Sequence, residues 1–303
     1  MKQKVVIIGC GNVGMSLAYA LLNQKTAVNE LVLIDLDLER IEGEVMDLNH
    51  CLSFAPSKID IKVGKYSDCS DAKIVCIAAG ANQNKGKTRM DLINKNSKIF
   101  ENIIGNVMAS GFNGIFLVAT NPLDVMTYLT WKYSNLPARK IIGSGTSLDT
   151  SRLRYLLSEK IGVNPKNVHA YVIGEHGDSE FVPWSNANIG LQNVKDYIQE
   201  EDMNKIENEV KNAAYEIINK KGATYYGIGM CLVRIINAIL GNENTIITVS
   251  TYDDNNDVFI GMPAIINNDG VKKKIYVELN DKETEKLQKS IDIIKSAINS
   301  LDE

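Results

Sequence analysis

A histidine that has acidic and basic residues within reach is the most chemically suggestive feature of this sequence. His176 lies in the segment VIGEHGDSEFVPWS and is one of only three histidines in 303 residues. A lone histidine is more often structural than catalytic, so His176 needs partners. Asp149, in the segment GSGTSLDTSRLR, is one candidate. A carboxylate bonded to one ring nitrogen would fix the tautomer and leave the other nitrogen to exchange a proton with a substrate.

A glycine-rich segment near the N-terminus is typical of a dinucleotide site. The sequence VVIIGCGNVG places Gly9, Gly11 and Gly14 between an apolar run and a helical pattern. The first glycine permits a tight turn, the second lets the backbone approach a pyrophosphate, and the third allows the helix to pack close to the strand. The helix start, at Asn12 and Val13, would offer its N–H groups to the phosphates.

An acidic residue at the end of the next apolar run supports this interpretation. Asp35 follows Gly14 by about 20 residues, where a ribose-binding carboxylate belongs. Such a carboxylate accepts hydrogen bonds from the 2′-hydroxyl and repels a 2′-phosphate, so the sequence favours NAD over NADP. The alternative, a glycine turn that binds no ligand, does not explain why strand, helix and acid are all in register.

The elements that must position these residues alternate between strand and helix in the first half of the chain. Continuous apolar runs predict buried strands, and apolar residues at helical spacing predict helices between them. This alternation builds an α/β fold with a doubly wound parallel sheet of the Rossmann type. The predicted strands are residues 4–8, 30–34, 72–77, 114–119 and 140–143, and the predicted helices are residues 13–24, 37–49 and 90–110.

The second half has a mixed pattern, which predicts a C-terminal α+β substrate domain. We expect an NAD-binding domain at residues 1–143 and a catalytic domain at residues 144–303, packed closely with a site between them. Asp281 is the expected cap of the last helix. The predicted helices are residues 149–160, 201–221, a following stretch to 240, and 281–300, and the predicted strands are residues 167–173, 245–252, 257–266 and 274–279.

Composition excludes several other classes of protein. The formal net charge of -4 does not favour nucleic acid or an anionic membrane surface as a partner. No apolar stretch approaches the roughly 18 residues of a membrane span. Five cysteines without a CxxC pair indicate reduced thiols, which predicts a cytoplasmic protein. No metal is expected.

Taken together, the motifs resemble the L-lactate/malate dehydrogenase family along nearly the whole chain, with the bacterial L-lactate dehydrogenases as the nearest members. Several motifs are specific in residue identity and in mutual spacing. They are the glycine loop, EGEVMDLNH, AGANQNKGKTRMDL, VATNPLDV, GSGTSLDTSRLR, IGEHGDSE, KGATYYGI and MPAIIN.

The resemblance implies a role for each polar residue of these motifs. His176 and Asp149 match the pair that delivers a proton to a keto oxygen while nicotinamide delivers hydride. Arg152, one helical turn after Asp149, matches the arginine that grips the substrate carboxylate with a planar fork. Arg89 matches the arginine that polarises the reacting carbonyl under a closing lid. Asn121 matches the asparagine that orients both substrate and nicotinamide.

Two residues from the second half match the far wall of the substrate pocket. Thr224 and Ile228, both within KGATYYGI, occupy the family's pocket-lining positions. Simple helix packing is the alternative for both.

The resemblance makes Gln83 the residue that selects the substrate. Six residues before the lid arginine, the family has glutamine in lactate dehydrogenases and arginine in malate dehydrogenases. A second substrate carboxylate facing the neutral Gln83 would be buried without a partner, at a cost of several kcal/mol. Pyruvate and L-lactate are therefore the expected substrates, with malate or a bulkier 2-hydroxy acid as alternatives. Lys87 stands where lactate dehydrogenases commonly have an acidic residue. Its positive charge could let the site bind dicarboxylates less unfavourably.

Arg154 and His169 match a pair that binds fructose 1,6-bisphosphate between subunits of many bacterial relatives. Arg154 lies about 200° around the helix from Arg152, so it faces away from the substrate. A structural role for both residues is the alternative. The resemblance implies a homo-oligomer, a tetramer or a dimer that closes into one. A hypothesis of another class, an inactive NAD-binding scaffold, predicts loss of the catalytic residues, and the sequence retains them.

Overall fold

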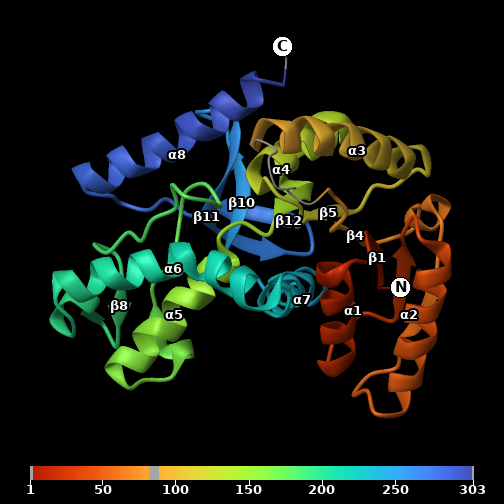
Figure 1. The fold of residues 1–303 in the computed structure, drawn as a ribbon, viewed down its shortest axis with the longest axis horizontal. Helices are drawn as coiled ribbons and strands as arrows, with labels where there is room; N and C mark the ends of the chain where they lie inside the picture. Colours follow the sequence, from red (N-terminus) through yellow and green to blue (C-terminus); the bar gives the residue numbers. More distant parts are fainter. Residues whose placement is uncertain (1–2, 82–88, 302–303) are drawn as a thin grey trace.

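One large sheet runs through the centre of the molecule (Figure 1). The computed structural model describes residues 3–81 and 89–301 of the chain. Six strands pair in parallel in the order β6-β5-β4-β1-β2-β3. Because the order reverses beside β1, the predicted doubly wound sheet is confirmed. The six strands are β1 (Lys4–Ile8), β2 (Glu30–Ile34), β3 (Asp60–Val63), β4 (Ile74–Ile77), β5 (Ile115–Val118) and β6 (Ile141–Gly143).

Three antiparallel strands from the second half extend the same sheet. They are β10 (Thr245–Asp253), β11 (Val258–Asn267) and β12 (Gly270–Lys274). β10 pairs with β6 through Ser250 and Gly143, so the strands of both halves form one continuous sheet. The strand predicted at residues 274–279 is wrong: β12 ends at Lys274. β12 begins at Gly270, before the predicted start, because a tight turn reverses the chain there. Gly270 has a φ of +100°, a conformation that favours glycine.

Helices cover both faces of this sheet (Figure 1). Alternate residues of β1 point to opposite faces, so Val6 belongs to one apolar cluster and Val5 to the other. One face is covered by α3 (Arg89–Ala109), α4 (Leu123–Ser134) and α8 (Asp281–Asn299). The other face is covered by α1 (Asn12–Asn23), α2 (Leu38–His50) and α7 (Tyr226–Leu240).

A smaller layer from the second half has its own apolar cluster. It contains α5 (Ser147–Ile161) and α6 (Glu200–Lys221), with a small sheet of β7 (Val168–His169), β8 (Asn188–Ile189) and β9 (Gln192–Asn193). The strand predicted at residues 167–173 shortens to β7 and an isolated bridge between Ile173 and Phe181. The short 3₁₀ helices are Cys51–Ser53, Tyr66–Cys69, Ala138–Lys140, Pro165–Asn167 and Val194–Asp196.

The last helix is capped one residue earlier than expected. Asn280, rather than Asp281, accepts a hydrogen bond from the backbone of Glu283, and the Glu283 carboxylate accepts one from the backbone of Asn280 in return. Across residues 3–81 and 89–301, no helix is both long and apolar enough to cross a membrane.

Candidate active site

The glycine loop after β1 is shaped by close backbone contacts. A side chain at Gly9, whose φ is +91°, would put its Cβ 2.3 Å from the backbone nitrogen of Ala79. A Cβ at Gly14 would lie 2.1 Å from the carbonyl oxygen of Gly9. Both contacts involve backbone, so only glycine lets β1, β4 and α1 approach this closely.

The start of α1 offers the groups that a pyrophosphate needs. Gly11 is the first residue before the helix, and no atom in the described part of the chain lies within 4 Å of where its Cβ would be. No side chain described here caps this end of α1. The backbone N–H groups at Asn12 and Val13 therefore remain available to phosphate oxygens, aided by the positive end of the helix dipole. Free N–H groups at a helix start fit the pyrophosphate of NAD.

The carboxylate of Asp35 lies beside this loop at the end of β2. Its Oδ2 accepts a hydrogen bond from the backbone N–H of Cys10 at 2.7 Å, and its Oδ1 accepts one from that of Asp37 at 3.1 Å. Burial raises the pKa of Asp35, but these backbone bonds and the nearby Arg40 outweigh it and lower the pKa below its usual value. Asp35 is thus an anchored anion, suited to accept hydrogen bonds from ribose hydroxyls.

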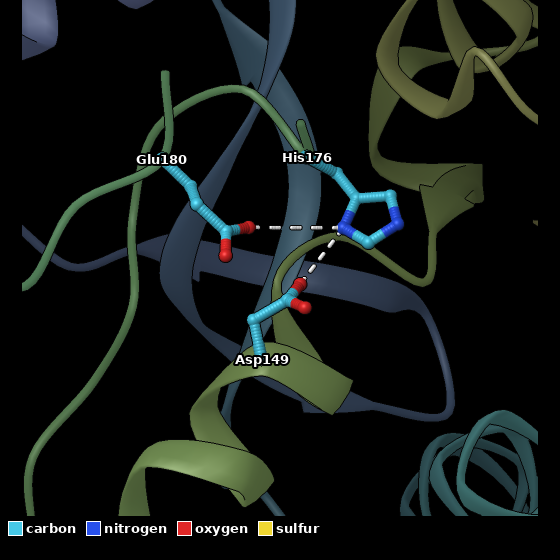
Figure 2. A group of neighbouring side chains, drawn as sticks. All are labelled: Asp149, His176 and Glu180. Carbon is cyan, nitrogen blue, oxygen red and sulfur yellow. Dashed lines mark hydrogen bonds and ion pairs between the residues drawn. The ribbon is translucent and has the colours of Figure 1, made fainter. Parts of the chain in front are cut away.

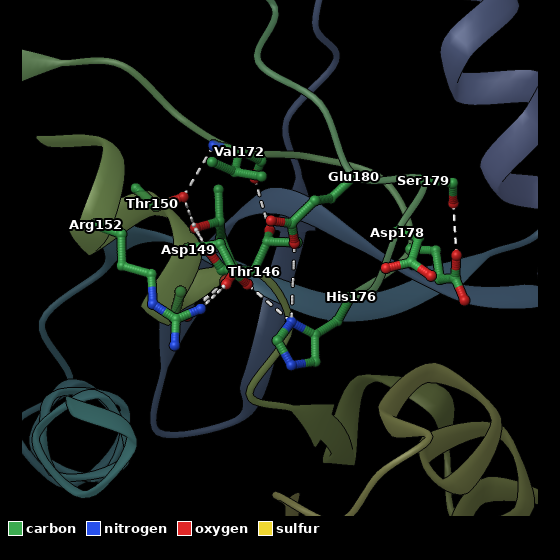
Figure 3. A network of polar contacts seen from close by, with 12 residues as sticks. Thr146, Asp149, Thr150, Arg152, Val172, His176, Asp178, Ser179 and Glu180 are labelled. Carbon is green, nitrogen blue, oxygen red and sulfur yellow. Dashed lines mark hydrogen bonds and ion pairs between the residues drawn. The ribbon is translucent and has the colours of Figure 1, made fainter. Parts of the chain in front are cut away.

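Two short segments bring Asp149 and His176 together. Asp149 lies in the first turn of α5, and Thr146 just before that turn donates to the carbonyl oxygen of Val172 at 2.6 Å. In return, the backbone N–H of Val172 donates to Thr150 at 2.9 Å. Figure 3 shows these bonds tying α5 to the segment that leads to His176.

His176 binds Asp149 through one ring nitrogen. Nδ1 lies 2.8 Å from Asp149 Oδ2, and the Asp149 side chain is only 2% exposed against 25% for His176. The backbone N–H of His176 donates to Asp124 Oδ2 at 2.8 Å, which fixes the loop on α4. In Figure 2, Nε2 points away from the Asp149 and Glu180 carboxyl groups. The arrangement leaves Nε2 to exchange a proton with a substrate.

The neighbours of His176 keep it protonated. Burial lowers the pKa of the imidazole, but the Asp149 carboxylate, with smaller contributions from Glu180 and Asp124, raises it to about 9. Burial also raises the pKa of Asp149, yet His176 and Arg152 outweigh it and lower that pKa. At neutral pH the pair is therefore an imidazolium bonded to a carboxylate, which is a proton donor.

Arg152 contacts the same carboxylate from the next turn of α5. Its NH1 donates to Asp149 Oδ1 at 2.7 Å, and 14% of its side chain is exposed. Each carboxylate oxygen of Asp149 thus binds one cationic side chain, Arg152 at Oδ1 and His176 at Oδ2. The remaining N–H groups of the guanidinium suit a carboxylate ligand.

Two acidic residues at this site were not predicted from the sequence. Glu180 lies with its Oε2 4.0 Å from His176 Nδ1, and it is 4% exposed. Asp124, in the motif VATNPLDV, is 2% exposed and accepts a hydrogen bond from Ser250 as well as from His176. The segment HGDSE placed Glu180 four residues after His176, which was the one available signal.

Asp149, His176 and Glu180 could also hold a metal ion by spacing, since their ligand atoms lie within 4.8 Å of one another (Figure 2). A cation there would replace the proton on Nδ1 and lie beside the guanidinium of Arg152. The existing charge pairs therefore favour proton transfer over metal binding.

The other predicted site residues lie at the edge of the sheet, at the start of α7 or outside the described residues. Asn121 follows β5 at the carboxyl edge of the sheet, and its carbonyl oxygen accepts a hydrogen bond from Asn96 at 2.8 Å. Thr224 lies between α6 and α7, and Ile228 is partly buried in the first turn of α7. Gln83, Lys87 and the side chain of Arg89 lie outside the described part of the chain.

Cys231, one turn after Ile228, was not anticipated near the site. Burial raises the pKa of its thiol to about 12, and the charges of Asp149 and Arg152 also act on it. α7 packs against α5, the helix that carries Asp149 and Arg152.

The two residues predicted to bind an effector lie on adjoining segments away from the pair. Arg154 Nε donates to the carbonyl oxygen of Ala170 at 3.1 Å, and its guanidinium lies 4.9 Å from the ring centre of Tyr171. His169, the residue before Ala170, is exposed in β7.

An NAD-dependent dehydrogenase requires both a glycine loop for a dinucleotide and a proton-transfer group such as the Asp149–His176 pair. Comparison with known families gives the same class. Residues 3–143 match the family described as lactate/malate dehydrogenase, NAD binding domain, and residues 146–303 match lactate/malate dehydrogenase, alpha/beta C-terminal domain. The chain belongs to the lactate/malate dehydrogenase family.

Individual relatives are similar over almost their whole length. An L-lactate dehydrogenase of Bacillus velezensis is 52% identical, covering 98% of this chain and 96% of that protein. An L-lactate dehydrogenase of Halalkalibacterium halodurans is 51% identical, and the match covers 97% of this chain and 96% of that protein. A lactate dehydrogenase structure from a Medee basin deep-sea metagenome library has a TM-score of 0.97 at 50% identity. The match covers 100% of this chain and 99% of that one. The ligand-bound minor L-lactate dehydrogenase of Enterococcus mundtii has a TM-score of 0.96 at 43% identity. The match covers 99% of this chain and 98% of that one.

Proposed function

We propose that this chain is an L-lactate dehydrogenase that reversibly reduces pyruvate to L-lactate with NADH. The observation that carries the proposal is the buried Asp149–His176 pair, whose Nε2 is directed away from its carboxylate partner. Relatives named L-lactate dehydrogenase, about half identical over nearly the full chain, support it.

His176 and Asp149 perform the proton transfer. Bound NADH supplies a hydride for the carbonyl carbon of the substrate. In pyruvate reduction, protonated His176 donates its Nε2 proton to the carbonyl oxygen, and in lactate oxidation the neutral Nε2 accepts the hydroxyl proton. Asp149 holds the proton on Nδ1 throughout, so that the exchanging proton is always the one on Nε2.

Arg152 is the group that orients the substrate. One of its nitrogens is fixed on Asp149, the same carboxylate that binds His176. Its other N–H groups bind the carboxylate of pyruvate, which would place the keto group beside Nε2. Arg89 polarises the carbonyl, Asn121 orients substrate and nicotinamide, and Thr224 lines the pocket wall.

The choice of substrate rests on Gln83, and substitution tests it. Gln83→Arg supplies a positive partner for a second carboxylate, so the preference is expected to move from pyruvate towards oxaloacetate. The measurement is the ratio of kcat/KM for the two substrates, with 2-ketoisocaproate as a bulky comparison. Wild-type rates highest with pyruvate support the proposal, and an unchanged ratio in the variant removes Gln83 as the selector.

We also propose regulation by fructose 1,6-bisphosphate in a homotetramer. The contact between Arg154 and Ala170 keeps this arginine close to the strand that carries His169, so one subunit offers two basic side chains on one surface. Two such pairs across a symmetry axis would bind two phosphate groups and relieve mutual repulsion.

Pyruvate saturation curves with and without the bisphosphate test this regulation. We expect activation in the wild type and none in Arg154→Gln, accompanied by a larger mass in light scattering when the effector is present. A wild-type curve that is hyperbolic and unchanged by the sugar phosphate would make the pair structural.

A further inference from the structure

Arg40, in the first turn of α2, lies against the carboxylate that is suited to the ribose of NAD. Its Nη2 is 3.2 Å from Oδ2 of Asp35. Its Nη1 donates a hydrogen bond to the carbonyl oxygen of Cys10, in the glycine loop, at 2.8 Å. The guanidinium is therefore held between the end of β2 and the loop that follows β1. A positive charge is thus fixed where a dinucleotide-binding fold of this type receives the ribose.

The donors around Asp35 form an anion site that the chain fills with its own carboxylate. Oδ2 of Asp35 accepts a hydrogen bond from the backbone N–H of Cys10 at 2.7 Å and lies beside the Arg40 guanidinium. Oδ1 accepts a hydrogen bond from the backbone N–H of Asp37 at 3.1 Å. Backbone N–H groups and a planar guanidinium are also the groups that bind a phosphate. The Asp35 carboxylate thus occupies a place whose donors suit a phosphate.

Two other acids face the same guanidinium. Oδ2 of Asp37 is 3.7 Å from Nε of Arg40, and Oε1 of Glu44 is 3.5 Å from its Nη1. These two side chains are 59% and 34% exposed, against 17% for Asp35. Solvent and salt therefore weaken the two longer pairs more than they weaken the pair of Asp35 and Arg40. Asp35 is the partner whose removal would free the guanidinium.

We propose that Arg40 is a second specificity residue for the cofactor and that its effect opposes that of Asp35. NADP differs from NAD by a phosphate on the 2′-oxygen of the ribose, the group at which this acid discriminates. Asp35 repels that phosphate and also engages Arg40, the residue that would bind it. Selectivity for NADH thus depends on one carboxylate, and without it Arg40 becomes a ligand of the 2′-phosphate. The inference goes beyond the proposed function, because it concerns the cofactor and not the choice of 2-oxo acid.

The test is a double-mutant cycle of Asp35→Ser and Arg40→Gln, read by direct binding. Serine keeps an oxygen that can accept a hydrogen bond from the backbone N–H of Cys10, but it carries no charge. NADH and NADPH are titrated separately against the full chain, without a 2-oxo acid, by the change in nicotinamide fluorescence. Because the two ligands differ only in the 2′-phosphate, the ratio of their dissociation constants reports the contacts of that group.

The expected effect of Arg40→Gln depends on whether Asp35 is present. Asp35→Ser should lower the Kd for NADPH by at least about tenfold, because a charge-assisted contact with Arg40 replaces charge repulsion. Adding Arg40→Gln should remove most of this gain. In the chain that keeps Asp35, Arg40→Gln should change the Kd for NADPH by less than about threefold, since the guanidinium is already engaged.

Two results overturn the proposal. An Asp35→Ser variant without a gain in NADPH affinity means that the freed donors do not bind the 2′-phosphate. A gain that survives Arg40→Gln means that the loss of repulsion is sufficient and that Arg40 has no part in it. Asp35→Ala repeats the cycle without the hydroxyl, so that one variant that fails to fold does not decide the outcome. If the wild type binds NADH but reduces no 2-oxo acid, the proposed function fails, while these titrations still decide the role of Arg40.

Arg234→Gln is the matched control. Arg234 lies in α7 and is also partly exposed, but its Nη2 pairs with Glu243 at 2.6 Å. Combined with Asp35→Ser, this substitution removes the same charge from the molecule without changing a contact of the Arg40 guanidinium. The combined variant is expected to keep the gain in NADPH affinity. A loss as large as that with Arg40→Gln would mean that overall charge decides, and it would overturn the proposal.

Discussion

At the scale of single residues, the site is a small set of buried charges arranged around one proton. Asp149 binds His176 on one oxygen and Arg152 on the other, and Glu180 lies behind them. The pKa of His176, raised to about 9 mainly by Asp149 against the lowering effect of burial, means that the ring carries a proton at neutral pH. The resting site is therefore prepared for pyruvate reduction.

The pH dependence of the two directions follows from this raised pKa. Pyruvate reduction needs protonated His176, so its kcat/KM is expected to be flat near neutrality and to fall as pH rises through about 9. Lactate oxidation needs the neutral ring and is expected to rise over the same range. Asp149→Asn removes the negative partner and should move both midpoints to lower pH. A wild-type midpoint at the ordinary histidine value of 6.5 would contradict the electrostatic account.

Sequence patterns could identify some of these residues and not others. Asp149 and Arg152 share one helix face, and His176 lies in a motif that is specific in sequence, so all three were predicted. Asp124 and Glu180 reach the site only because the fold brings α4 and the loop after Ile173 to His176, and pairing across elements leaves no local signature.

At the scale of elements, the packing of α1 against α7 joins the glycine loop to the substrate-binding half. A Cβ added at Gly229 in α7 would lie 2.9 Å from the backbone carbon of Ser16 in α1. The two helices therefore meet backbone to backbone. Since α1 begins at the glycine loop, its position affects the phosphate-binding N–H groups directly.

Gly229→Ala is expected to separate these helices. The added methyl meets backbone that cannot move aside, so we expect a loss of about 1–3 kcal/mol in the free energy of unfolding and weaker NADH binding. Gly43→Ala is the matched control, because Gly43 lies in α2 with nothing within 4 Å of its Cβ position. That control should gain about 1 kcal/mol from helix propensity. Chemical denaturation and NADH titration check both, and equal stability of the two variants would refute the close-packing argument.

Elements with a strong apolar signal were predicted well, and those fixed by turns or edges were not. β1 and β2 are five-residue runs buried throughout, and both match their predicted bounds. β3 was missed, because the edge strand DIKV alternates exposed and buried residues and carries two charges. β12 was misplaced, because the turn at Gly270 rather than the apolar run after Lys274 fixes its register.

At the scale of the whole molecule, one continuous sheet couples the two halves. β10 continues the parallel sheet from β6, and α7 covers the face that also carries α1. Apolar residues from both halves thus share two clusters, and the sequence could not reveal this, because strand pairing between distant segments has no local pattern. The boundary that we place near Gly143 divides the chain without dividing the core.

A fragment of residues 1–143 tests this coupling. Without α7 and β10 it would expose the apolar residues beneath α7 and the open edge of β6. We expect the fragment to lack a cooperative thermal transition, whereas the full chain should unfold in one transition by calorimetry. A fragment that unfolds cooperatively and binds NADH would show two independent domains instead.

The most direct test of the central claim is the turnover of His176→Gln with pyruvate and NADH. We expect kcat to fall by at least about 100-fold, because the proton donor is lost. The NADH dissociation constant should stay unchanged, because the glycine loop and Asp35 bind the cofactor separately. Near-normal turnover in the variant, with NADH binding intact, would contradict the assignment of His176 as the proton-transfer residue.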